Sequence, residues 1–139
     1  LIALAILALG GPSAQSEESE KRPPPFAGDS EWMTSFPEAQ LCQIAGGKPI
    51  LILVWMDNDS RTERLEKNLQ SWTAVQGALS AYCKVHLKVE EHRDFVDSLG
   101  VTRAPCLVLV ASDPLRPVEE RVIGILEELE ESQGVLAFL

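Results

Sequence analysis

The chain has 139 residues, of which 45% are hydrophobic, so it is long enough for one domain with a buried core and a short tail. Its formal net charge of −9 at pH 7 argues against a nucleic-acid partner, because phosphate binding requires a basic face. Acidic residues occur along the whole chain, and we interpret them as a charged surface that keeps the protein soluble.

The N-terminus resembles an export signal. Residues 1–16 begin with an apolar run and end in small residues, which is typical of the hydrophobic and cleavage regions of such signals. Retention of this segment as a membrane anchor is the alternative, and an anchor needs about 20 apolar residues. We therefore expect an exported protein that is periplasmic, secreted or tethered to a membrane, with membrane contact only through this segment.

A linker and the first helix come next. Residues 17–28 are acidic and then proline-rich, so they bury too little apolar surface to offset their conformational entropy and are predicted to form a disordered linker. The folded domain is predicted over residues 29–139. Apolar side chains at helical spacing over residues 32–42 indicate its first helix, which starts at either Ser30 or Ser35.

A buried strand and a long helix follow. Residues 50–56 are almost entirely aliphatic, which is typical of a strand covered on both faces. Apolar residues then recur every three or four positions over residues 65–82, and this stripe predicts one helix with Trp72 in the core. Ser60 and Glu63 have the spacing of a capping box at its start.

The last part of the chain is predicted to hold two more helices and three strands. Alternating residues over 83–89 predict either an edge strand or a strand with a solvated polar face. The other predicted elements are a helix at 92–99, strands at 106–111 and 119–123, and a helix at 126–133. This order predicts an α/β fold: a three-layer α/β/α sandwich around a four-stranded mixed sheet.

Several short stretches resemble the thioredoxin-like superfamily, and within it the exported thioredoxin-like proteins with a helix before a strand that begins Lys-Pro. The stretches are Lys48–Trp55, Val101–Val110, Gly124 before the last helix, Trp32, and residues 36–39. The resemblance covers about residues 30–131. It implies a thioredoxin-like fold, with the functional turn directly after the strand at residues 50–56.

The chemistry of this family requires a CxxC motif at a helix start, where the helix N-terminus lowers the pKa of the first thiol. The resemblance places Asp59 and Thr62 at the two cysteine positions, and Leu53 where thioredoxins carry a buried acid. Neither Asp nor Thr forms a disulfide, so we expect no dithiol oxidoreductase activity from this turn. Helix capping, worth about 0.5–2 kcal/mol, explains the polar turn more simply than a binding role does.

Pro105 matches the proline that the family keeps in the cis form opposite the functional turn, where the neighbouring backbone pairs with a bound peptide. This match favours a peptide-binding groove and a purely structural turn equally. The candidate groove residues are Trp55, Asp57, Asn58, Ala104 and Pro105.

Three cysteines, Cys42, Cys83 and Cys106, allow either one disulfide with a free thiol or no disulfide, and their spacing does not indicate a pairing. Cys106 follows Pro105 directly and is the candidate nucleophile. A buried core thiol explains it better, because no histidine or second cysteine is placed to activate it.

A metal site formed by Asp57 and Asp59 with His86 or His92 is not supported by ligand spacing, so we predict neither a metal nor another cofactor. We predict a protein- or peptide-binding or structural module without redox activity. The alternative is a monothiol disulfide oxidoreductase or isomerase that uses Cys106, and a third class is a structural domain on a membrane tether.

Overall fold

The computed structural model describes residues 32–113 and 115–139. The predicted export signal (residues 1–16) and linker (residues 17–28) lie outside these described residues. The helices are α2 (Phe36–Gly46), α3 (Ser60–Ser71), α4 (Thr73–Leu79), α5 (Arg93–Ser98) and α6 (Ser132–Phe138), the 3-10 turns are η1 (Val89–Glu91) and η2 (Val118–Glu120), and the strands are β1 (Ile50–Trp55), β2 (Cys83–Lys88), β3 (Cys106–Val110) and β4 (Val122–Leu126). None of the described helices is long and apolar enough to span a bilayer.

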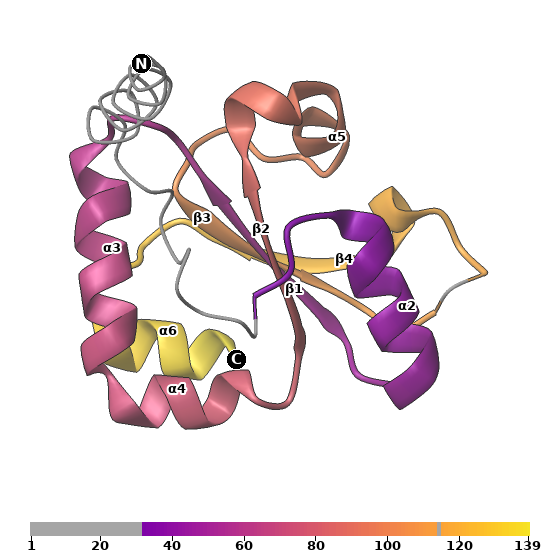
Figure 1. Cartoon of the computed structure of the whole chain (residues 1–139), viewed down its shortest axis with the longest axis horizontal. Coiled ribbons are helices and arrows are strands. Elements are labelled where there is room, and N and C mark those ends of the chain that lie inside the picture. The colour runs from indigo at the N-terminus through magenta and orange to yellow at the C-terminus, as the bar shows by residue number, and fades with distance from the viewer. Residues whose placement is uncertain (1–31, 114) are drawn as a thin grey trace, which may run out of the picture.

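The four strands form one mixed sheet in the order β2-β1-β3-β4 (Figure 1). β1 is parallel to β2, whereas β3 is antiparallel to both of its neighbours, β1 and β4. Side chains of β1 alternate between two buried clusters. Ile50, Ile52 and Val54 belong to one, and Leu51 and Leu53 belong to the other. A strand buried on both faces must be apolar throughout, which explains why β1 carries no polar residue.

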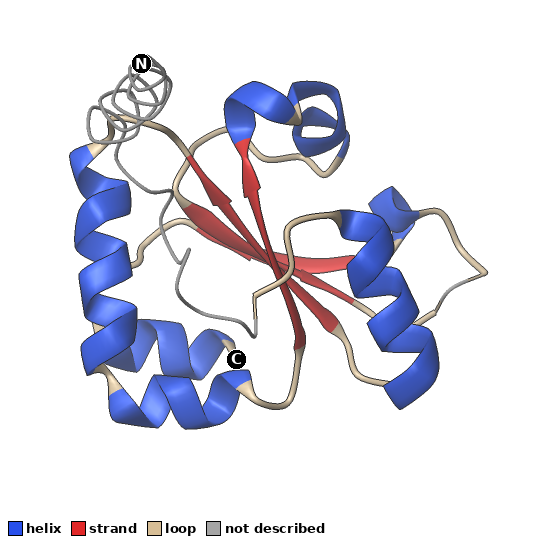
Figure 2. Ribbon diagram, viewed as in Figure 1, coloured by secondary structure: helices blue, strands red, loops and turns tan. Residues whose placement is uncertain are grey.

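Helices cover both faces of the sheet and complete three layers (Figure 2). On one face, α2 and α5 contribute Ala39 and Val96 to the first cluster. On the other face, α3, α4 and α6 contribute Leu65, Val75 and Val135 to the second. The predicted three-layer α/β/α sandwich with a four-stranded mixed sheet is therefore confirmed.

The single long helix predicted after residue 60 is wrong, because the chain breaks at Trp72 into α3 and α4. Trp72 has extended backbone angles, φ −86° and ψ 90°, and is only partly buried. Its N–H still donates to the carbonyl of Asn68 and its own carbonyl accepts from Gln76 N, so both helices stay capped. The apolar stripe continues across the break because α3 and α4 pack into the same cluster, although the chain changes direction between them (Figure 1).

The prediction for β2 is partly right: it is an edge strand of the sheet, but its polar face is not solvated. Lys84 and His86 are 6% and 9% exposed. Residue 33 pairs with this edge: Met33 N donates to the carbonyl of Lys84 at 2.8 Å, and His86 N donates to the carbonyl of Met33 at 2.9 Å. The side chains of Lys84 and His86 contact Trp32 and Trp55. The Lys84 ammonium lies 5.7 Å from the ring centroid of Trp32, a cation–π distance that offsets part of the cost of burial.

One open boundary is settled and two others differ from prediction. The first helix uses the later of its two predicted starts, because Ser35 Oγ accepts from Glu38 N as its N-cap. The last strand and helix begin later than predicted. Residues 118–120 form a 3-10 turn, and Leu126 is still paired with Leu107 in the sheet.

Candidate functional site

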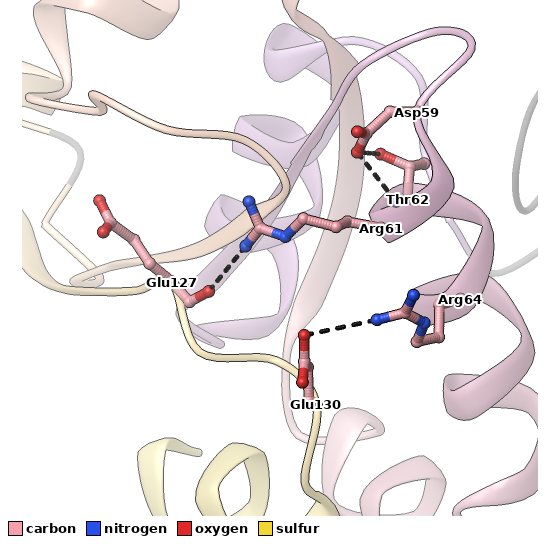
Figure 3. Close-up of polar contacts among 6 residues, drawn as sticks. All are labelled: Asp59, Arg61, Thr62, Arg64, Glu127 and Glu130. Atoms are coloured by element: carbon pink, nitrogen blue, oxygen red, sulfur yellow. Dashed lines mark hydrogen bonds and ion pairs between the residues drawn. The ribbon is translucent and has the colours of Figure 1, made fainter.

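The turn after β1 is closed by hydrogen bonds at the two positions where the family resemblance expects cysteines. Asp59 Oδ2 accepts from both the backbone N–H and the hydroxyl of Thr62, each at 3.0 Å (Figure 3). The Thr62 hydroxyl in turn accepts from Met56 N at 3.4 Å. Asp59 is therefore the N-cap of α3, with extended angles of φ −118° and ψ 122°. The predicted capping box at Ser60 is wrong by one residue, because Ser60 already lies inside the helix.

Two side-chain contacts between β1 and β2 support the start of this turn. Trp55 is 4% exposed, and its indole N–H donates to His86 Nδ1 at 3.2 Å. Lys88 Nζ lies 3.0 Å from Asp57 Oδ2 and 5.7 Å from the Trp55 ring centroid. The hydrogen bond to Asp57 raises the pKa of Lys88 above its ordinary value. Of the predicted groove residues, Trp55 is thus a buried support, whereas Asp57 and Asn58 are exposed.

Residues 101–105 lead into β3, the strand that pairs with β1, and lie close to this turn. The peptide bond between Ala104 and Pro105 is cis. Within the described part of the chain, no backbone hydrogen bond involves residues 101–104. Thr102 and Arg103 are exposed and Ala104 is half-buried, so the N–H and C=O groups of this segment are available for hydrogen bonds at the surface.

A pocket of about 140 Å³ lies beside the 101–105 segment. Its apolar lining comes from three parts of the chain: Met56 after β1, Val89 and Val96 around α5, and Val101 with Ala104. Its polar rim consists of Arg93, Asp97, Thr102 and Arg103. Of these lining residues, the sequence indicated only Ala104 as part of a groove. The usable signal was local: Met56 is an exposed apolar residue after a buried strand, and Arg103 directly precedes the Ala104–Pro105 pair.

On its other side, Pro105 borders a small hollow shared with Arg61, Arg64 and Leu65 of α3. Arg61 Nη2 donates to the carbonyl of Glu127 at 3.4 Å, and Arg64 Nη1 lies 3.5 Å from Glu130 Oε2 (Figure 3). These contacts hold the start of α3 against the segment between β4 and α6. The first turns of α3, which Asp59 caps, and the loop at Pro105 therefore line the same hollow.

Comparison with known proteins gives matches only among solved structures, since no protein-family profile and no curated protein matches the chain. A thioredoxin from Thermus thermophilus aligns at TM-score 0.65 and 18% identity, over 78% of this chain and 84% of its own. Trxlp from Edwardsiella tarda aligns at TM-score 0.53 and 19% identity, over 75% of this chain and 89% of its own. Chloroplastic thioredoxin z aligns at TM-score 0.54 and 12% identity, over 77% of this chain and 88% of its own. The chain has a thioredoxin-like fold.

In this thioredoxin-like fold the two disulfide-bonded cysteines lie away from the turn. Cys42 and Cys83 form a disulfide that joins α2 to the start of β2, with Cα atoms 6.0 Å apart. Cys83 pairs with Ile50, the first residue of β1, whereas the functional turn follows Trp55. Five residues of strand separate the two, or roughly 17 Å at about 3.3 Å per residue. The disulfide thus lies at the opposite end of the sheet from the position of a thioredoxin dithiol.

Cys106 is the free thiol among the described cysteines, and it is fully buried in β3. Burial, with a smaller effect from the negative charge of Glu127, raises the pKa of the Cys106 thiol to about 12. A thiol with that pKa is almost entirely protonated at neutral pH, and the thiolate is the reactive form. The geometry therefore provides neither a lowered pKa nor access for a substrate disulfide.

The residues weighed above as metal ligands, Asp57, Asp59, His86 and His92, do not form one cluster. Asp57 pairs with Lys88, Asp59 caps α3, and His86 accepts from Trp55. In the described ranges, no group of three or more His, Cys, Asp or Glu side chains is arranged to hold a metal ion.

Proposed function

We propose that this domain is a non-catalytic binding module that holds an extended segment of a partner protein against residues 102–104. The observation that carries the proposal is that the backbone of residues 102–104, at the surface of the domain, makes no backbone hydrogen bond within the described part of the chain and lies beside a pocket with an apolar floor and a polar rim. Extended peptides bind such free backbone edges through main-chain hydrogen bonds, while pockets for alternate side chains give specificity.

The size of the pocket supports a peptide side chain as its occupant. At about 140 Å³ it lies well below the roughly 300–1,000 Å³ of typical small-molecule and cofactor sites. A space of this size, with Met56, Val89 and Val96 in its lining, suits one apolar side chain of a bound strand.

The polar turn supports binding rather than thiol chemistry. A hydrogen bond between Asp59 and Thr62 takes the place of a redox pair, and the pKa of Cys106 is raised to about 12. We also propose that the protein is exported. The Cys42–Cys83 disulfide supports this, because disulfides form and persist mainly in oxidising compartments.

The test is selection of peptides from a displayed random heptapeptide library against the full chain, followed by fluorescence polarisation with the selected peptides. Met56→Glu introduces a charge into the pocket and should weaken binding about tenfold or more, because the carboxylate must lose its water there. Leu136→Glu is the matched control: Leu136 is 40% exposed on α6, and Met56 is 37% exposed.

Failure to enrich any peptide, or equal losses in both variants, would contradict the proposal. An insulin-reduction assay run beside it addresses the alternative enzyme. Turnover that disappears in Cys106→Ala would establish a monothiol oxidoreductase instead.

A further inference from the structure

The arginines of this acidic protein are concentrated around the Pro105 loop. The full chain carries a net charge of −9. Four of the six arginines in the described ranges lie on the pocket and the hollow that flank Pro105: Arg61, Arg64, Arg93 and Arg103. A positive surface in a negative protein is the expected complement of a negative ligand.

Two of these guanidinium groups have no carboxylate partner among the described residues. Arg93 makes no side-chain hydrogen bond or ion pair, although it lines the 140 Å³ pocket. Arg61 donates to a backbone carbonyl, that of Glu127, at 3.4 Å. An arginine fork binds a carboxylate with two parallel hydrogen bonds, so both side chains retain capacity for an incoming acid.

The acids that pair with the other two arginines are easily displaced. Arg103 Nη1 lies 3.7 Å from Glu127 Oε1, with side chains 55% and 30% exposed. Arg64 Nη1 lies 3.5 Å from Glu130 Oε2, with side chains 56% and 65% exposed. Ion pairs as long and as exposed as these contribute little to stability. The rim of the pocket carries one carboxylate, that of Asp97, and two guanidinium groups, those of Arg93 and Arg103.

From this arrangement we infer that the partner segment is acidic, with a carboxylate on each side of one apolar residue. Resting on the proposed function, the inference adds the chemical class of the ligand. In an extended strand paired with residues 102–104, the apolar side chain enters the pocket between Met56 and Val96. Acidic side chains two positions before and after it lie on the same face of the strand and reach the arginines on the rim of the pocket, Arg93 and Arg103.

The experiment measures binding of three heptapeptides to the full chain by fluorescence polarisation. Each has Leu at its centre, and the residues two positions before and two positions after it are both Glu, both Gln or both Lys. We expect the Glu peptide to bind about tenfold tighter than the Gln peptide and the Lys peptide to bind weakest. Added salt should weaken the Glu peptide most, because surface attraction between charges is screened.

The structure offers a matched control for the arginines. Arg103 and Arg116 are 55% and 57% exposed, and each lies close to one glutamate, at 3.7 and 3.8 Å. Arg116 follows β3, whereas Arg103 precedes it, so the two side chains lie at opposite ends of that strand. Arg103→Glu and Arg93→Glu should each abolish the preference for the Glu peptide, and Arg116→Glu should leave it within about twofold.

The outcomes separate the two proposals. Equal binding of all three peptides, lost in Met56→Glu, would overturn the acidic ligand and leave the groove in place. A loss in Arg116→Glu as large as that in Arg103→Glu would show an effect of net charge alone and would also overturn it. No binding of any peptide would contradict the groove itself.

Discussion

At the amino end of β1 the domain is held by a disulfide and a buried guanidinium, whereas at the carboxyl end it is held by hydrogen bonds of a surface turn. Cys42–Cys83 and the contact between Gln43 and Arg121 fix α2 to the sheet at the first end. At the second end, Asp59 caps α3 and the 101–104 backbone is left unpaired. The comparison suggests that one end of this thioredoxin-like fold provides stability and the other provides a binding surface.

The amino end depends first on its disulfide, which gives the largest predicted effect. Replacement of both Cys42 and Cys83 by Ala should lower the free energy of unfolding by about 4 kcal/mol, because the bond closes a loop with a sequence separation of 41 in the unfolded chain. Urea unfolding followed by tryptophan fluorescence measures this, and dithiothreitol should have the same effect on the native chain.

Cys106→Ala serves as the control, since its stability should remain sensitive to the reductant. If the double variant is as stable as the native chain, the amino end is not the stabilised one and the comparison fails.

The buried network at the same end should show the next largest effect. Gln43 is 2% exposed, and its Oε1 accepts from Arg121 Nη1 at 3.0 Å while its Nε2 donates to the carbonyl of Ala111 at 3.2 Å. Gln43→Ala should cost about 2–3 kcal/mol, because it leaves a buried cation short of an acceptor. Gln40→Ala, on the same helix, should change stability by about 0.5 kcal/mol or less.

The opposite change sharpens this argument. The Nε atom of Arg121 already lacks a hydrogen-bond partner, so the guanidinium is incompletely satisfied. Replacement of both partners, Gln43→Leu together with Arg121→Met, should therefore be neutral or stabilising, since apolar replacements of buried polar and charged pairs often are. A large loss of stability in this double variant would mean that the contact itself, despite its incomplete hydrogen bonding, stabilises this end.

The general fold could be predicted because its signals are local. The aliphatic run at β1 and the Pro105 stretch indicate buried strands wherever they occur, and their order limits the topology. The burial of Lys84 and His86 could not be predicted, because the side chains that contact them, Trp32 and Trp55, are distant in sequence. The break at Trp72 was hidden because both helices face one core.

The candidate site was predicted only in part for the same reason. Asp59 and Pro105 stand in recognisable local contexts, so their places could be inferred. Met56, Arg93 and Arg103 belong to three separate segments and share a pocket only after the chain has folded. No spacing in the sequence connects them, and the cysteine pairing was open for the same reason.

At the carboxyl end, loss of the cap should have a smaller effect than either change at the amino end. Asp59→Ala removes the acceptor for Thr62 N and should lower the free energy of unfolding by about 1 kcal/mol. Asp59→Asn keeps an acceptor and should cost only a few tenths of that. Urea unfolding again provides the measurement. A loss in Asp59→Ala of the size seen for the disulfide would remove the difference between the two ends.

Cys106 should contribute nothing that depends on pH near neutrality. Burial raises the pKa of its thiol from 9.0 to about 12, so the folded chain keeps a proton that the unfolded chain loses. This contribution to stability is therefore complete below about pH 9 and is lost as the pH rises toward 12. Melting temperatures of the native chain and of Cys106→Ala, compared between pH 7 and pH 11, should run parallel below pH 9 and converge above it.

The same burial predicts that iodoacetamide modifies Cys106 at pH 8 only when urea unfolds the chain. Rapid modification of the folded chain at pH 7 would instead place a reactive thiol beside the Pro105 loop, and the carboxyl end would then be a catalytic rather than a binding surface.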